Sequence, residues 1–153
     1  MKLVDILPEA LVIPALKGQT KEDVLRELAE YMAARYPDID AGRLVEVLWE
    51  RERLGSTAIG DGIAIPHGKL PGVRALRAAF GRHLQGVEFQ SLDGHPTRLF
   101  FLLVAPEDLV GQHLKALARV SRLLKEPSFR NQLMAAGTRE ELYRCIREED
   151  SKY

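Results

Sequence analysis

A glycine-rich stretch around one histidine is the part of the sequence best suited to chemistry. Residues 55–68 read Gly-Ser-Thr-Ala-Ile-Gly-Asp-Gly-Ile-Ala-Ile-Pro-His-Gly. Glycines let the backbone adopt positive φ or approach a partner closely, and Pro66 fixes φ just before the histidine. Residues 63–65 are short, apolar and partly β-branched, which predicts a buried strand that delivers His67 to a surface. We therefore expect His67 to carry the reactive atom.

A histidine in this setting would act as a general base or as a nucleophile that accepts a phosphoryl group. Neutral imidazole attacks phosphorus readily because its pKa lies near neutral pH. The added charge then needs hydrogen-bond donors and a nearby cation. Backbone N–H groups of the glycine-rich turn would donate, and Arg51 would supply the cation, unless it is only a solvated arginine at a helix end. Neither Ser56 nor Thr57 lies in a Gly-x-Ser-x-Gly motif, so the pattern does not favour a catalytic triad.

The other three histidines are His83, His95 and His113. His113 shares a helical face with apolar residues four, seven and eleven positions later, which is typical of a residue at the edge of a core. It would join the site only if the fold paired it with His67. For His83 and His95 the sequence shows no pattern that points to a site, and we expect structural or exposed roles for them. No Cys or Glu stands at metal-ligand spacing from any histidine, so we expect no metal site.

This stretch matches the beginning of two nucleotide-binding motifs but lacks the other residues that each motif requires. Residues 55–60 have the glycine spacing of a phosphate-binding loop, but Asp61 and Gly62 stand where Lys and Ser or Thr are needed. The dinucleotide motif fails as well, because Ile65 occupies the place of its third glycine. We therefore expect no cofactor.

Composition predicts one ordinary domain over residues 1–153. Lys and Arg together balance Asp and Glu at 22 each, which argues against nucleic acid as a partner. The single cysteine, Cys145, excludes an internal disulfide, fits a reducing compartment and is expected to be a buried helix residue. The N-terminus lacks a signal-peptide pattern, and the longest apolar run, 99–105, is too short to span a bilayer. These features predict a cytoplasmic protein without membrane insertion.

Hydrophobic periodicity predicts strands interspersed with helices. We expect strands over residues 11–13, 63–65, 74–84 and 98–105. Helices are expected after Thr20, from Asp40 to Gly55, from Pro106, from Pro127 through Met134, and after Thr138. The helix from Pro106 should bury the residues at helical spacing Leu114, Leu117, Val120, Ser121 and Leu124. This order predicts an α/β sandwich: a mixed central sheet with helices on both faces, in a single domain.

The run from Glu52 to Gly68 resembles a known phosphorylation-site signature. With Ile59-Gly60, residues 63–65 and Pro66-His67-Gly68, it is similar to the fructose/mannitol-type IIA proteins of the bacterial phosphoenolpyruvate-dependent phosphotransferase system. The similarity covers nearly the whole chain, and residues 55–57 and 68–70 are most similar to the nitrogen-regulatory branch of that family. The family implies an α/β sandwich with a mixed sheet, in agreement with the periodicity.

The resemblance also implies roles for single residues. His67 would receive the phosphoryl group from a small histidine phosphocarrier protein. His113 resembles the family's second active-site histidine, and Arg51 resembles the arginine that balances phosphate charge. Asp61 stands where the family often has asparagine, and would either repel the phosphoryl group or point away and cap a turn.

These observations predict a cytoplasmic phosphocarrier of the phosphotransferase system that regulates partner proteins. Regulation is favoured because this chain contains neither a membrane segment nor a second phosphotransferase domain. One alternative is a sugar-specific IIA component that passes phosphate to a separate IIB protein. Another is a binding module without phosphotransfer, in which Asp61 partly mimics a phosphate.

Overall fold

A six-stranded mixed sheet forms the centre of the protein. The structure, a computed structural model, describes all residues from 1 to 153. The strands are β1 (Val12–Ile13), β2 (Ala58–Gly60), β3 (Ile63–Ala64), β4 (His67–Lys69), β5 (Arg77–Val87) and β6 (Thr97–Ala105). Their order is β1-β5-β6-β3-β2, and β4 also pairs with β6. β5 and β6 are antiparallel, whereas β1 is parallel to β5 and both β3 and β4 are parallel to β6.

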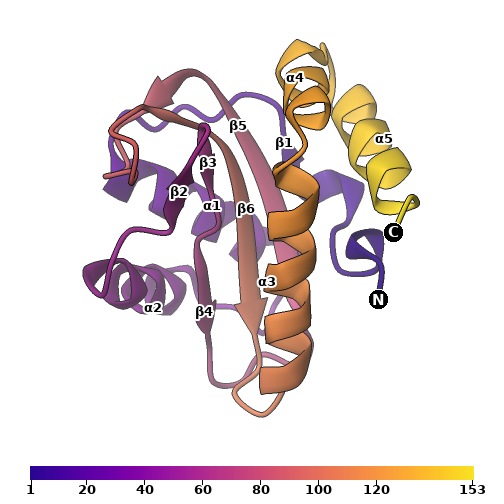
Figure 1. The fold of residues 1–153 in the computed structure, drawn as a ribbon. Helices are drawn as coiled ribbons and strands as arrows, with labels where there is room; N and C mark the ends of the chain where they lie inside the picture. Colours follow the sequence, from indigo (N-terminus) through magenta and orange to yellow (C-terminus); the bar gives the residue numbers. More distant parts are fainter.

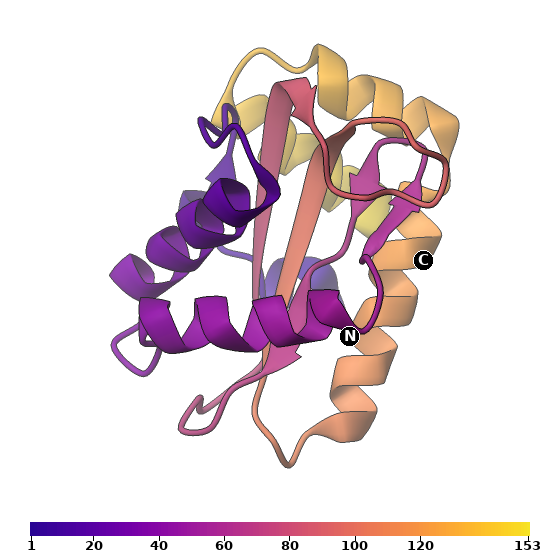
Figure 2. The ribbon, with the colours of Figure 1, turned by 90° about the vertical axis from the view of Figure 1, so that its left-hand side faces the viewer.

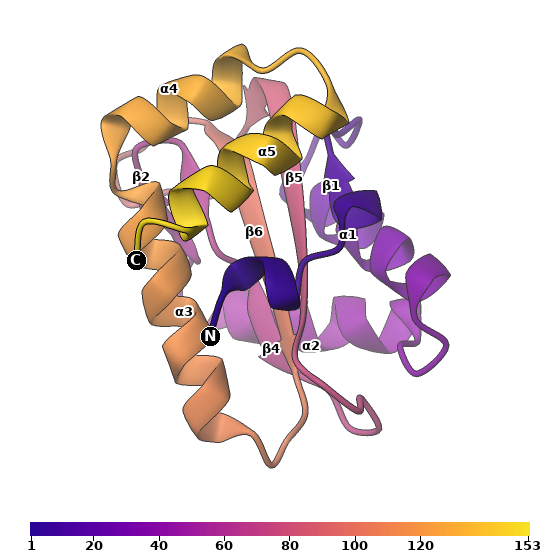
Figure 3. The same cartoon turned by 90° about the vertical axis from the view of Figure 1, so that its right-hand side faces the viewer.

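Helices cover both faces of this sheet (Figure 1). α1 (Lys21–Arg35) and α2 (Ala41–Arg53) lie against one face, as Figure 2 shows. α3 (Val110–Leu124), α4 (Pro127–Ala135) and α5 (Arg139–Asp150) lie against the other (Figure 3). Two short 3₁₀ turns, η1 (Leu3–Asp5) and η2 (Glu9–Leu11), precede β1. The predicted α/β sandwich with a mixed sheet is confirmed.

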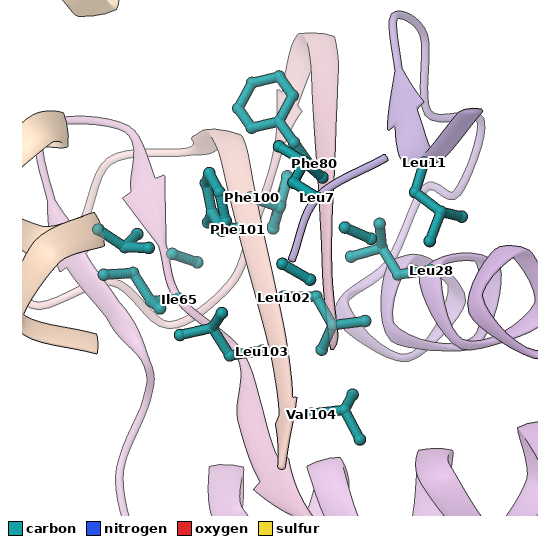
Figure 4. Close-up of a cluster of buried hydrophobic side chains, with 14 of the residues drawn as sticks. Leu7, Leu11, Leu28, Ile65, Phe80, Phe100, Phe101, Leu102, Leu103 and Val104 are labelled. Atoms are coloured by element: carbon teal, nitrogen blue, oxygen red, sulfur yellow. The ribbon is translucent and has the colours of Figure 1, made fainter. Parts of the chain in front are cut away.

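β6 runs through the middle of the core. Eight of its nine residues are buried, because helices cover the strand on both faces. The rings of Phe80 on β5 and Phe101 on β6 meet edge to face, with centroids 6.0 Å apart (Figure 4). All 41 buried apolar residues form one cluster, so helices from both faces are joined by a single core.

The helix starts predicted from capping residues are confirmed for three helices. The side-chain oxygens of Thr20, Asp40 and Thr138 each accept a hydrogen bond from the backbone N–H three residues later, at 3.0 to 3.1 Å. These bonds satisfy N–H groups that have no partner within the helix. α2 ends, as predicted, just before Gly55, which has a φ of 145°.

Three element predictions need correction. The long helix starts at Val110, not at Pro106, and residues 107–108 form a turn. Its buried residues are His113, Ala116, Val120, Leu123 and Leu124, whereas Leu114 is 61% exposed, because the inner face is rotated by about one residue from the predicted stripe. β5 begins at Arg77 instead of Arg74, because the backbone N–H of Arg74 donates to Asp38 Oδ2 at 2.9 Å.

Cys145 is only partly buried on α5, so its predicted burial is too strong. Its pKa is raised, chiefly because burial disfavours the thiolate. No helix in the chain combines the length and the apolar character needed to span a membrane.

Candidate functional site

Two short strands separated by a proline place His67. β3 and β4 continue one another along β6 with constant register, Ala64 opposite Phe100 and His67 opposite Leu103. Pro66 separates them because it has no N–H for the ladder, although its carbonyl still accepts from Leu103 N at 3.0 Å. His67 is thus the first residue of a short strand whose position is fixed by the central strand.

Gly68 lets α2 come close to this strand. A Cβ built at Gly68 would lie 2.5 Å from Cγ1 of Val47 on α2. Successive residues of a strand point to opposite sides, so His67 points away from Val47 and toward α3. The glycine therefore determines both how close α2 lies and which way the histidine faces.

The imidazole of His67 is held at both nitrogens. Nδ1 lies 2.8 Å from the carbonyl oxygen of Ile65, which can only accept, so we assign the proton to Nδ1. Nε2 then carries the lone pair. Nε of Arg51 donates to it at 3.3 Å, and Nη1 of Arg51 donates to the carbonyl of Gly55 at 2.9 Å. The predicted proximity of Arg51 to His67 is present in the structure.

His113, from the first turn of α3, completes this group. Its ring meets the ring of His67 edge-on, with centroids 5.5 Å apart and an interplanar angle of 75°. His113 is buried, and its Nε2 has no hydrogen-bond partner. A buried polar atom without a partner is rare in native proteins, and here it lies beside a candidate nucleophile.

Burial and charge keep both imidazoles neutral. The pKa of His67 lies below its usual value mainly because burial disfavours the cation, with a further contribution from Arg51. The hydrogen bond to Ile65 and the charge of Glu52 oppose this shift. The pKa of His113 is lowered by burial first and then by His67 and Lys69. Near neutral pH the lone pair on His67 Nε2 is therefore available.

The two histidines line a cavity of ≈ 420 Å³ between the end of α2, β4 and the start of α3. Apolar side chains stand exposed at its rim: Leu54 is 85% exposed, and Val110 and Leu114 are exposed as well. The cavity is lined by Val47, Glu50, Arg51, Leu54, His67, Gly68, Lys69, Val110, His113, Leu114 and Leu117. A nucleophile in a hollow with an apolar rim is reachable by a protein partner.

A buried ion pair stabilises the loop that leads to the site, and no pattern in the sequence predicts it. Nζ of Lys21 lies 2.9 Å from Oε1 of Glu52, and both side chains are almost fully buried. Glu52 also accepts from the backbone N–H of Thr57 at 3.0 Å and from its hydroxyl. Thr57 O accepts from the N–H of Ile65, whose own carbonyl holds His67. The only sequence signal was the position of Glu52 at the start of the signature run.

Asp61 lies outside this cavity. It occupies the turn between β2 and β3, where Asp61 and Gly62 have φ of 58° and 76°, as an Asp-Gly hairpin requires. Its N–H donates to Oδ2 of Asp93 at 3.0 Å. Asp61 does not contribute to the shifted pKa of His67. Of the two roles considered for it, this geometry favours the turn.

The remaining histidines have structural or exposed positions. Nε2 of His83 lies 2.8 Å from the carbonyl of Gly18, and its Nδ1 accepts from Gly86 N at 2.9 Å. His95 is exposed in the turn before β6. The chain contains no group of three or more His, Cys, Asp or Glu side chains placed to hold a metal ion.

The fold and this site define a class: an α/β protein with two histidines and an arginine around a cavity at the edge of a mixed sheet. The sequence matches the family model described as phosphoenolpyruvate-dependent sugar phosphotransferase system, EIIA 2, over residues 5–149, and the chain belongs to that family. It is accordingly a component of the phosphotransferase system, whose EIIA proteins work with partner proteins.

Relatives place it near the nitrogen-regulatory members. A nitrogen regulatory protein of Bradyrhizobium diazoefficiens is 41% identical over 95% of both chains. The crystal structure of the nitrogen regulatory protein IIA-Ntr from Neisseria meningitidis has a TM-score of 0.88 at 31% identity, covering 94% of this chain and 98% of that one. A fructose-specific EIIABC component of Bacillus subtilis is 35% identical over 98% of this chain, but only 24% of that protein is covered.

Proposed function

We propose that this protein is a phosphocarrier that accepts a phosphoryl group on Nε2 of His67. One observation carries the proposal: the carbonyl of Ile65 holds the proton on Nδ1, so the lone pair of Nε2 faces the cavity beside Arg51. The lowered pKa of His67 keeps that lone pair free near neutral pH. The family supports a role in the phosphotransferase system.

The transfer is a simple displacement at phosphorus. The Nε2 lone pair forms a bond to phosphorus while the N–P bond to the donor histidine breaks, and that electron pair returns to the donor ring. The Nδ1 proton stays on its hydrogen bond to Ile65, so His67 needs no separate base. The product is a phosphorylated Nε2 whose ring has not changed orientation.

Arg51 and His113 stabilise the product. Arg51 now directs Nε–H at the lone pair that the phosphoryl group would occupy, so it would turn this donor to a phosphoryl oxygen. Nε2 of His113 lacks a partner and would donate to another oxygen in the tautomer that protonates it. Both contacts strengthen as negative charge builds on the transferred group.

The donor we propose is a small histidine phosphocarrier protein, and the recipients of the signal are regulated partner proteins. The exposed Leu54, Val110 and Leu114 around the cavity offer an apolar contact surface for such proteins. The similarity to nitrogen regulatory proteins supports a regulatory role. We place this exchange in the cytoplasm, where such donors act.

A second candidate is transfer to a IIB protein during sugar uptake. It is favoured by the 35% identity to a fructose-specific EIIABC component. The two roles share the chemistry at His67 and differ in the acceptor. Incubating the phosphorylated protein with a purified fructose-type IIB protein separates them, because rapid loss of the phosphoryl group would indicate the sugar role.

The proposal is tested by intact-mass spectrometry after incubation with phosphoenolpyruvate, enzyme I and a histidine carrier protein. The wild-type protein and the control variant His83→Gln should each gain one acid-labile phosphoryl group, and His67→Ala should gain none. A wild-type protein that stays unmodified with both nitrogen-branch and sugar-branch carriers would refute the proposal and support a binding module without phosphotransfer.

A further inference from the structure

A second hollow lies on the other side of α3 from His67. It has a volume of ≈ 740 Å³ and lies between the N-terminal segment, the end of α1, the start of β5 and the start of α3. Figure 3 shows these elements around the end of the sheet where α3 begins, which α4 and α5 leave uncovered. No residue lines both this hollow and the His67 cavity. It is therefore a separate feature of the surface.

Four cationic side chains gather around this hollow. They come from separate parts of the chain: Arg35 at the end of α1, Arg74 in the loop before β5, Arg77 at the start of β5, and Lys115 on α3. The only acidic residue in the lining is Asp5. The chain as a whole has equal numbers of acidic and basic residues, so this excess of positive charge is local.

Most of these cations have no carboxylate partner. Only Arg77 forms an ion pair, with Asp38 at 3.5 Å, and its buried Nε has no hydrogen-bond partner. The guanidinium of Arg77 stacks 3.9 Å from the ring centre of Tyr36, which holds it in place. The side chains of Arg35, Arg74 and Lys115 form no hydrogen bond and no ion pair. Guanidinium donors left free around a hollow suit phosphate oxygens, which they bind in pairs.

The rest of the lining is apolar, and the size fits a small molecule. Val4, Ile6, Leu76 and Leu109 contribute apolar surface between the cations. Volumes of about 300–1,000 Å³ are usual for small-molecule sites, whereas protein partners are met by flatter surfaces. A ligand with an organic body and several negative charges matches both parts of the lining.

From this arrangement we infer that the hollow beside Arg74, Arg77 and Lys115 binds a phosphorylated small molecule of about nucleotide size. Its phosphate groups lie among the guanidinium groups and Lys115, and its organic body lies against the apolar wall. α3 links the hollow to the phosphorylation site, because Gln112 and Lys115 line the hollow while His113 and Leu114 line the His67 cavity. The inference does not depend on phosphorylation of His67.

Isothermal titration calorimetry with ATP as the probe tests this inference. We expect saturable binding with a Kd below about 1 mM at low salt, weakening as salt is added. Arg74→Gln and Lys115→Gln should each raise the Kd about tenfold, because each removes a charge-assisted hydrogen bond. Backbone amide shifts on adding ATP should centre on residues 74–77 and 112–115.

A control variant and two further ligands define the results that would contradict the inference. Arg26→Gln removes one positive charge from an exposed pair on α1 with Glu22, and should leave the Kd unchanged. Pyrophosphate should bind more weakly than ATP because it lacks an organic body, and uncharged adenosine should bind more weakly still. Absence of saturable ATP binding, an equal loss in Arg26→Gln, or equal binding of adenosine would each overturn the inference. Thermal melts of the variants establish that they are folded.

Discussion

The two hydrogen bonds of His67 do different things to its chemistry. The bond from Nδ1 to the Ile65 carbonyl selects which nitrogen is nucleophilic. The guanidinium of Arg51 at Nε2 makes protonation there unfavourable, because a second cation would form beside it. At the scale of single residues, Arg51 therefore has two effects. Before phosphorylation it lowers the pKa of His67, and after phosphorylation it balances the charge of the phosphoryl group.

Replacing Arg51 with Gln should raise the pKa of His67. Burial still lowers this pKa, but the variant loses the cation that lowers it further. In the wild-type protein the imidazole should become protonated only below the usual pH range of a histidine, and in Arg51→Gln at higher pH than in the wild type. The measurement is an NMR titration of the His67 ring. Arg53→Gln, an exposed change on the same helix turn, is the control, and an unshifted Arg51→Gln curve would remove Arg51 from this role.

His113→Ala should slow phosphoryl acceptance without unfolding the protein. The variant lacks the donor that we assign to a phosphoryl oxygen, and loss of such a bond reduces the rate by about tenfold to a hundredfold. Rapid-quench kinetics with a phosphorylated carrier protein measures the change. The exposed His95 gives the control variant His95→Ala, which should transfer at the wild-type rate. Equal rates in both folded variants would contradict the role of His113.

At the scale of elements, the site is built where α2 and α3 approach the β4 edge. α2 supplies Arg51 and, through Glu52, holds the loop that leads to β2. α3 supplies His113 from its first turn. The distance of α2 from β4 depends on Gly68, and the distance between α1 and α2 depends in part on the pair Lys21–Glu52.

Gly68→Ala should destabilise the fold by about 1–3 kcal/mol, the usual cost of overpacking. The new methyl group would stand 2.5 Å from Val47 Cγ1, so α2 must move. Urea denaturation measures the loss. In the Val47→Ala background the same substitution should cost less, because the two sites are coupled. Gly111→Ala on α3, where nothing lies within 4 Å, is the control and should not destabilise.

Lys21→Met should lower the free energy of unfolding by about 3–5 kcal/mol, because it leaves the carboxylate of Glu52 buried without its cation. Urea denaturation is again the measurement. Breaking the exposed pair Glu22–Arg26 on the same helix with Arg26→Met should cost less than about 1 kcal/mol. Similar losses in the two variants would show that the buried pair is no more important than a surface one.

At the scale of the whole molecule, the structural features that could be predicted from the sequence are those that depend on local sequence patterns. The fold class, the helix starts at Thr20, Asp40 and Thr138, and the central strand near residues 98–105 follow from periodicity and capping. The stripe predicted for the long helix is only partly right: Val120 and Leu124 are buried, but the inner face is offset, because the rotation of a helix about its axis is decided by packing against β6 and not by the helix itself.

The site was predicted less completely than the fold. His67, Arg51 and His113 were named from a motif and a family resemblance, but sequence spacing says nothing of the 5.5 Å between the two rings. Lys21 and Glu52 are 31 positions apart, so no local pattern links them. For Asp61 the sequence left two roles open, and the Asp-Gly pair is the usual signal of the hairpin turn that the structure shows.

The central claim is that Nε2 of His67 accepts the phosphoryl group, and NMR of the phosphorylated protein with ¹⁵N-labelled histidine tests it most directly. Our account predicts one phosphohistidine, at His67, with phosphorus bonded to Nε2 and the proton retained on Nδ1. A phosphoryl group on Nδ1, or on His113, His83 or His95, would contradict the geometry on which the account depends.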